Sequence, residues 1–166
     1  GNLVAMVVLG FNQGMQPIAG YNYGACRYSR VIRVFKLTLV AGTITTTIGF
    51  AMAELIPRPI ALAFTTDEQL INLTVNGMRI NLLLFPIVGF QMVTTTFFQS
   101  IGKAKISIFL SLTRQAIFLI PALLILPHFY GLNGVWASGP VADLLSSLLT
   151  LAVLYTLFRK KGMLSA

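Results

Sequence analysis

The chain has 166 residues, of which 56% are hydrophobic and 10% are charged, and its mean hydropathy is +0.83. Soluble domains carry about 25% charged residues, so this composition excludes a chain surrounded mostly by water and predicts an integral membrane protein. The formal net charge is +8, but the basic residues form clusters separated by long uncharged runs. This layout does not provide the basic face that a nucleic-acid-binding protein needs.

Five stretches are long enough to span a bilayer, which takes about 20 apolar residues. They cover approximately residues 2–23, 34–56, 70–100, 106–126 and 134–158. The third is longer than one span requires, so we expect its first turns to lie outside the membrane or the helix to tilt. The predicted fold class is therefore an all-α membrane protein with five transmembrane helices. Because the chain opens inside an apolar helix pattern, we expect it to be a fragment that lacks an N-terminal part.

The basic residues predict the orientation of these segments. If the helices alternate, the links after the first and third segments lie on the same side of the membrane as the tail after the fifth. Basic residues accumulate in cytoplasmic loops, so this side, with the C-terminus, is predicted to be cytoplasmic. Ten of the twelve Lys and Arg residues fall there: Arg27, Arg30, Arg33, Lys36, Lys103, Lys105, Arg159, Lys160, Lys161 and, just inside the fourth segment, Arg114.

Apart from Lys36, at the cytoplasmic start of the second span, four charged residues lie within the predicted spans. A charge at the bilayer centre costs at least ~2.5 kcal/mol. Glu54 and Arg79 lie near the outer interface, where we expect their side chains to reach water. For Arg114 we expect anchoring at the inner interface or pairing with the adjacent loop. Asp143 lies deeper, and two roles stay open for it: a structural or coupling polar network, which we favour, and a contact with substrate.

Prolines interrupt four of the five predicted spans. Each can be a simple kink fixed by packing, but four in five helices favour a bundle that bends or gates. Uncharged polar residues also occur in the spans, as amides and as two threonine runs, 43–47 and 94–96. The amides are expected mostly to bond between helices, and the threonines either line a cavity or bond to their own helix carbonyls. The prolines are Pro17, Pro86, Pro121 and Pro140, and the amides are Asn12, Gln13, Gln16, Asn22, Asn81, Gln91 and Gln99.

The sequence gives no support for an enzyme or a metal site. Cys26 and His128 are each the sole residue of their type, so neither a disulfide framework nor a zinc cluster can be built. No Ser-His-Asp set, no pair of carboxylates within one span and no glycine-rich phosphate loop with a lysine is present. We therefore expect no cofactor.

Four motifs together resemble the multidrug and toxic compound extrusion (MATE) transporters, in particular their bacterial multidrug branch. QPIAGYNYGA at 16–25, followed by a basic loop, is similar to the end of a helix in the family's C-terminal lobe. FFQSIGKAK at 97–105, SLTRQAIFLIPALLILP at 111–127 and GLNGVWASGPVADLL at 131–145 resemble later segments of the same lobe. The resemblance covers essentially the whole chain, and the order of the motifs agrees.

The resemblance implies a twelve-helix fold of two lobes, of which this chain would hold the last five helices, with the N-terminal lobe missing. It implies antiport, in which a proton or sodium ion enters while a cationic or amphipathic drug leaves, in a bacterial inner membrane. The candidate residues for the substrate path or its polar network are Gln13, Gln16, Asn22, Asn81, Gln91, Gln99, Arg114 and Asp143, and those for helix breaks or gating are Pro17, Gly20, Gly24, Pro86, Pro121 and Pro140.

Two features qualify what the resemblance implies. Some branches couple ions through a carboxylate on the helix that here holds residues 85–99, and this chain has no Asp or Glu there, so coupling is expected in the missing lobe. The first segment is expected to break at Gly20 and Gly24, with its amides facing the lobe interior.

Two alternative functions stay open. One is a flippase of the same superfamily for lipid-linked saccharides, which would need more Arg or Lys in its cavity. The other is a non-transporting membrane scaffold.

Overall fold

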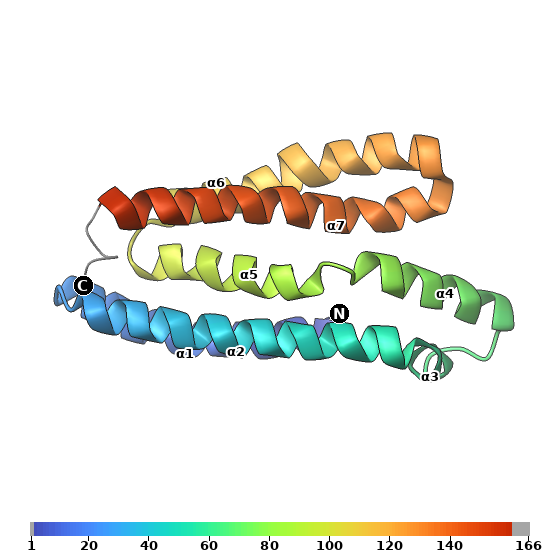
Figure 1. Cartoon of the computed structure of the whole chain (residues 1–166), viewed down its shortest axis with the longest axis horizontal. Coiled ribbons are helices and arrows are strands. Elements are labelled where there is room, and N and C mark those ends of the chain that lie inside the picture. Colours follow the sequence, from blue (N-terminus) through green and yellow to red (C-terminus); the bar gives the residue numbers. More distant parts are fainter. Residues whose placement is uncertain (1, 161–166) are drawn as a thin grey trace.

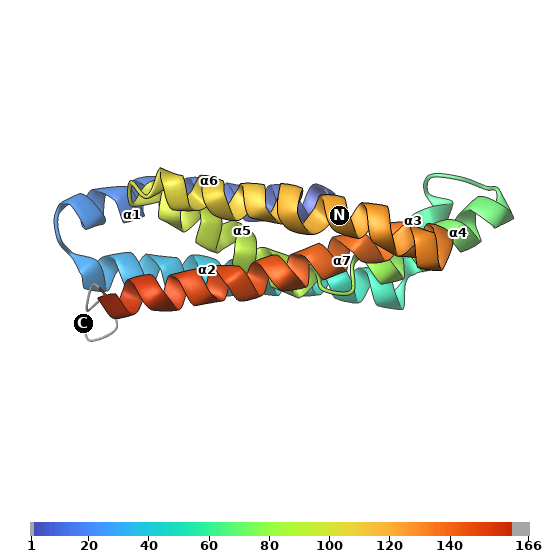
Figure 2. The same ribbon diagram turned by 90° about the horizontal axis from the view of Figure 1, so that it is seen from above.

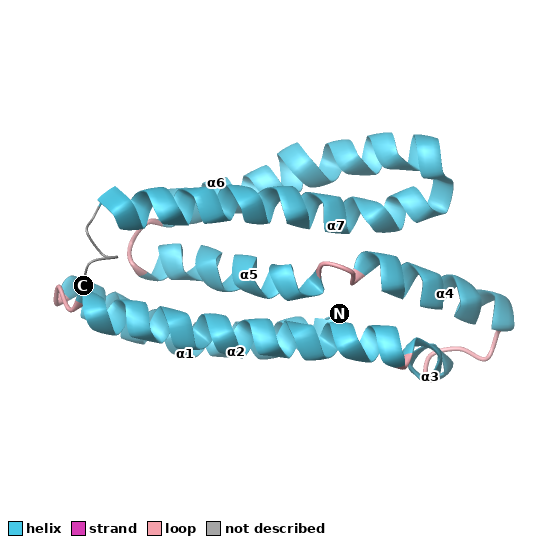
Figure 3. Ribbon diagram, in the orientation of Figure 1, coloured by secondary structure: helices cyan, strands magenta, loops and turns pink. Residues whose placement is uncertain are grey.

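The computed structural model describes residues 2–160, and every regular element in that range is helical (Figure 3). This confirms the predicted all-α class. Figure 1 shows the elongated bundle that the helices form. The elements are α1 (Asn2–Gly24), α2 (Tyr28–Leu55), α3 (Pro57–Leu62), α4 (Glu68–Asn81), α5 (Phe85–Ser100), α6 (Ala104–Leu112), the π-helix η1 (Thr113–Leu119) and α7 (Ile120–Lys160).

Helix α5 occupies the centre of the bundle. It contacts α1 and α2 on one side and α6 and α7 on the other, and Figure 1 shows it between these two groups. Seen from above in Figure 2, α5 runs through the middle of the bundle, with α1 and α6 along one edge and α2 and α7 along the other. Its apolar residues Val93, Phe97 and Phe98 are fully or almost fully buried in the main hydrophobic core. The rings of Phe97 and Phe35 of α2 lie 4.4 Å apart, centroid to centroid. The outer faces of the helices expose large apolar side chains, as expected of surfaces in contact with lipid.

The third predicted segment is not one helix. It is broken between α4 and α5, and the two helices meet at an angle of 54°. Pro86 lies in the first turn of α5. Backbone N–H groups in the first turn have no partner within the helix, so a proline is tolerated there. The predicted single helix over 70–100 is therefore wrong in its middle, because the proline starts a new helix instead of bending an existing one.

Helix α7 contains a reversal of the chain. Gly131 has φ 57° and ψ −135°, which are not helical values, and the chain turns back on itself in this orange part of the ribbon (Figure 1). The two arms, 120–130 and 132–160, correspond to the end of the fourth predicted segment and to the fifth. Each of the five predicted segments thus lies on helical structure, with different limits. For example, α2 begins at Tyr28, because the basic residues before position 34 continue the helix.

Within residues 2–160, three helical stretches are long and apolar enough to cross a membrane: Leu3–Gly24, Tyr28–Leu55 and Ala104–Arg159, the last of which contains the reversal at Gly131. The bent pair α4 and α5 passes the same test if it is taken as one span. The links α1–α2 and α5–α6 and the end of α7 gather at one end of the bundle, on the left in Figure 1. Most basic residues are therefore at that end; Lys161 lies outside the described residues.

Helix α1 is continuous from Asn2 to Gly24, so the predicted break at Gly20 is wrong. A Cβ atom at Gly20 would lie 3.0 Å from the carbonyl oxygen of Ser100. The glycine therefore serves close packing against the end of α5 and does not interrupt the helix. Gly24 is the last residue of α1.

Helices α2 and α5 approach closely at glycines, and this contact yields a prediction. A Cβ atom on Gly89 would lie 2.5 Å from Oγ1 of Thr46 and 2.9 Å from the carbonyl oxygen of Gly42. Small residues permit such backbone contact between membrane helices. We expect Gly89→Ala to lower the free energy of unfolding by about 1–3 kcal/mol, as other overpacked cores do. Unfolding in mixed micelles measures this, with Gly10→Ala, which has open space around it, as the control.

Candidate functional site

The most buried charge in the described bundle is paired. Nε and Nη2 of Arg114 lie 2.7 and 2.6 Å from Oδ1 of Asp143. The Asp143 side chain is 9% exposed and that of Arg114 is 34% exposed. The pair joins η1 to the second arm of α7. Asp143 is therefore ion-paired inside the bundle, and Arg114 pairs with it and not with its adjacent loop as predicted.

Arg114 lies on the π-helix, where the backbone bonds close wider turns than in an α-helix. The N–H of Ile120 donates to the carbonyl of Gln115, five residues earlier. Pro121, which cannot donate to any carbonyl, follows immediately. A π-segment inserts an extra residue per turn and is often found at functional sites. Here it shifts the register of the helix beside the proline and places Arg114 opposite Asp143.

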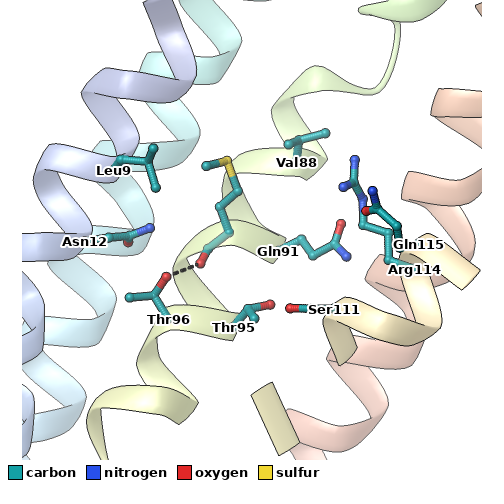
Figure 4. A pocket seen from close by; sticks show the side chains of 10 residues that line it. Leu9, Asn12, Val88, Gln91, Thr95, Thr96, Ser111, Arg114 and Gln115 are labelled. Atoms are coloured by element: carbon teal, nitrogen blue, oxygen red, sulfur yellow. Dashed lines mark hydrogen bonds between the residues drawn. The ribbon is translucent and has the colours of Figure 1, made fainter. Parts of the chain in front are cut away.

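A cavity of about 400 Å³ lies beside the pair. It is bounded by α1 on one side and by α6 and η1 on the other, with α5 between them (Figure 4). In Figure 4, Asn12 points from α1 toward α5, and Gln91 points from α5 toward Arg114. We refer to this space as the first cavity. It is lined by Leu9, Asn12, Val88, Gln91, Met92, Thr95, Thr96, Ser111, Arg114 and Gln115.

A second cavity, of about 710 Å³, lies between α4, α5 and α7. Asn81, Trp136 and Asp143 line it together with apolar residues of α4. Trp136 packs against α4 at Gly77, where an added Cβ would lie 2.7 Å from the indole ring. Arg114 and Val88 line both cavities. The ion pair therefore stands at the boundary between the two spaces.

The structure brings together four of the predicted path residues and leaves four apart. Gln91 and Arg114 line the first cavity, and Asn81 and Asp143 line the second. Gln13 and Gln16 are exposed on α1 and line neither cavity, so the expectation that the amides of α1 face the interior is wrong for these two. Asn22 is buried and donates to the carbonyl of Ile18 at 2.8 Å. Gln99 is exposed beside a separate hollow on α6.

The predicted gating prolines take different positions. Pro86 starts α5 at the break and Pro121 follows the π-helix. Pro17 and Pro140 lie inside helices that continue past them, so these two residues do not end a helix. The half-buried side chain of Glu54 and the exposed side chain of Arg79 form a loose ion pair at 3.7 Å, which the sequence did not predict.

Several cavity residues were absent from the predicted site, notably Asn12 and Ser111. Asn12 is 2% exposed, and neither atom of its carboxamide has a hydrogen-bond partner among the described residues. Its spacing from Val8 and Met15 along α1 marks the buried face of that helix and could have singled it out. The threonines show both predicted roles, because Thr96 lines the cavity and donates to the carbonyl of Met92 at 2.9 Å.

Fold and site define a helical membrane bundle with polar cavities and a charge pair in its interior. The chain belongs to the MatE family, whose sequence profile matches residues 1–125. This agrees with the resemblance found in the sequence. The chain is therefore part of a multi-pass membrane protein.

Named relatives and solved structures agree with this assignment. Multidrug export protein MepA of Staphylococcus haemolyticus (strain JCSC1435) is 21% identical over 92% of this chain and 33% of its own length. The MATE multidrug transporter DinF-BH, solved in complex with a ligand, is 44% identical, with a TM-score of 0.86 over 92% of this chain and 34% of that one. The Vibrio cholerae MATE transporter VcmN in its bent form is 16% identical and shares the fold. The match has a TM-score of 0.86 and covers 97% of this chain and 37% of VcmN.

The chain thus spans about a third of the length of the relatives that it matches. Its all-helical fold corresponds to a portion of a two-lobe MATE transporter, which confirms the predicted class of an all-α membrane protein.

Proposed function

We propose that this chain forms part of a secondary active multidrug exporter, which removes amphipathic or cationic compounds in exchange for protons or sodium ions. The observation that carries the proposal is the match of nearly the whole chain to multidrug transporters, at 44% identity to one that was solved with a bound ligand. The polar cavities beside a broken helix support it, because transporters place their binding sites at interrupted helices inside the membrane. The partners are small-molecule drugs, the bilayer and an N-terminal lobe.

We further propose that the protein lies in a bacterial inner membrane with the basic end of the bundle in the cytoplasm. The support is the concentration of Lys and Arg in the links at that end. Asp143 is the only acidic residue that lines either of the two described cavities. It is therefore the candidate in this part of the chain for a group that responds to the coupling ion, although the main ion site is expected in the N-terminal lobe.

The proposal is tested by resistance to ethidium in drug-sensitive bacteria that express the complete natural polypeptide containing this chain. Expression should raise the concentration of ethidium that stops growth, because the dye is exported. Unchanged sensitivity, with the protein shown to be in the membrane, would contradict export.

The same assay ranks two carboxylates. We expect Asp143→Asn to remove most of the resistance, since it alters the buried pair between the cavities. Glu54→Gln should change it less than about twofold, since a loose ion pair at 3.7 Å with an exposed arginine contributes little. Glu54 is the matched control because it also faces an arginine, in a looser pair whose arginine is exposed. Equal resistance in both variants would contradict a role for Asp143.

A further inference from the structure

The first cavity has an unusual charge pattern for a protein that handles cations. Its lining contains one positively charged residue, Arg114, and no carboxylate. Asp143 faces the second cavity, and its Oδ1 accepts both contacts from Arg114. A cation placed in the first cavity would therefore meet a guanidinium and neutral amides, with no acidic side chain in the lining to bind it.

Arg114, which lines this cavity, keeps hydrogen-bonding capacity that Asp143 does not use. A guanidinium has five N–H donors and cannot accept a hydrogen bond. Two of its nitrogens, Nε and Nη2, contact Asp143, and about a third of the side chain stays exposed. Whatever binds to the remaining donors must present an acceptor.

The charge of the pair narrows the class of acceptor. Because Asp143 neutralises Arg114, an anionic ligand gains no net attraction and would lie near the carboxylate of Asp143. An uncharged oxygen is not repelled by the carboxylate of Asp143 and does not depend on a net charge attraction. It still accepts hydrogen bonds from a charged donor, which are stronger than those between neutral groups.

The remaining lining fits an amphipathic molecule with such an oxygen. Leu9, Val88 and Met92 supply apolar surface, and the methionine side chain can adapt to different shapes. Gln91 and the unpartnered carboxamide of Asn12 can each donate and accept. A buried amide without a partner is costly, so a ligand or water that reaches Asn12 would gain from bonding to it.

We propose that the first cavity is a subsite for the uncharged acceptor oxygen, such as an amide carbonyl, of an amphipathic ligand, with Arg114 as its donor. The proposal rests on the proposed function in that the ligand would be an export substrate, and it specifies which part of that substrate this lobe recognises. Asp143 positions Arg114 and does not itself contact the ligand here.

The test is equilibrium binding to the purified complete polypeptide in nanodiscs, without any transport step. The probes are three fluorescent naphthylbutyl compounds that end in an N,N-dimethylamide, a carboxylate or a trimethylammonium group. We expect the amide to bind at least tenfold more tightly than the other two. Tightest binding of the trimethylammonium compound would overturn the proposal.

The variant Arg114→Met with Asp143→Leu removes the donor without leaving a buried charge, a replacement that packed proteins often tolerate. It should bring the amide within about threefold of the trimethylammonium compound. The control removes the exposed ion pair, through Arg58→Gln with Glu68→Gln, and should keep the preference. A preference for the amide that survives loss of Arg114 would contradict its role as the donor.

A second variant covers the possibility that the double replacement fails to fold. Ser111 is exposed at the rim of the first cavity, so Ser111→Phe should block the cavity and weaken amide binding at least fivefold. Thr156→Phe, on the exposed face of α7, should have no effect. Unchanged binding in Ser111→Phe would place the amide elsewhere. If the amide does not bind while ethidium is still exported, the proposed subsite is wrong and the proposed function stands. If the amide binds but ethidium is not exported, the proposed function is wrong and the subsite stands.

Discussion

Replacement of Arg114 alone by Met is expected to lower the free energy of unfolding by about 3 kcal/mol or more, since loss of one partner leaves the other as an uncompensated buried charge. The stranded group would be Asp143, whose side chain is only 9% exposed. Asp143→Leu alone should cost less, because the longer Arg114 side chain is one-third exposed and can move toward water.

The double variant decides whether this reasoning holds. Arg114→Met with Asp143→Leu should recover most of the stability lost in Arg114→Met, because no unpaired charge remains. The measurement is a double-mutant cycle by unfolding of the complete polypeptide in mixed micelles, which isolates the coupling between the two residues. Additive costs in the cycle would show that the two side chains do not act as a pair.

The second large effect is expected at Gly134, where the two arms of α7 pack together. A Cβ atom there would lie 2.5 Å from the carbonyl carbon of Leu126 and 2.7 Å from the nitrogen of Pro127. These are backbone atoms, which cannot move away by a change of rotamer, so Gly134→Ala must push the two arms of α7 apart. We expect a loss of about 3 kcal/mol in the free energy of unfolding, at the upper end of overpacking effects.

Gly14→Ala is the matched control for Gly134→Ala. Gly14 also lies in a helix, and nothing stands within 4 Å of its added Cβ. Alanine is favoured over glycine in helices by about 1 kcal/mol, so this variant should be neutral or slightly stabilising. A similar stability of both variants would show that the arms do not pack as closely as described.

The helical architecture could be predicted from the sequence because it depends on local signals. Long apolar runs marked the helical segments, and clusters of Arg and Lys marked the links that gather at one end of the bundle. The break before Pro86 was harder to predict, because a proline in an apolar run can bend a helix or start one. Which outcome occurs depends on how α4 packs against α7.

The candidate site was only partly accessible. Arg114 and Asp143 stand 29 residues apart, and their pairing depends on the reversal at Gly131 and on the register of the π-helix. Neither the pairing nor the π-helix was predicted from local composition. Asn12 was missed for a different reason: unless each amide of α1 is assigned to a face of the helix, the buried ones cannot be told from the exposed ones. The buried neighbours Val8 and Met15 place Asn12 inward and leave Gln13 outward.

The central claim, that this chain belongs to an ion-coupled drug exporter, is tested most directly in everted membrane vesicles that contain the complete polypeptide. Because everted vesicles expose the cytoplasmic face outward, the measurement is ethidium uptake into them under an imposed proton gradient and then under a sodium gradient. We predict uptake driven by one of the two gradients, which would also identify the coupling ion. No uptake under either gradient, with the protein shown to be folded, would contradict ion-coupled export.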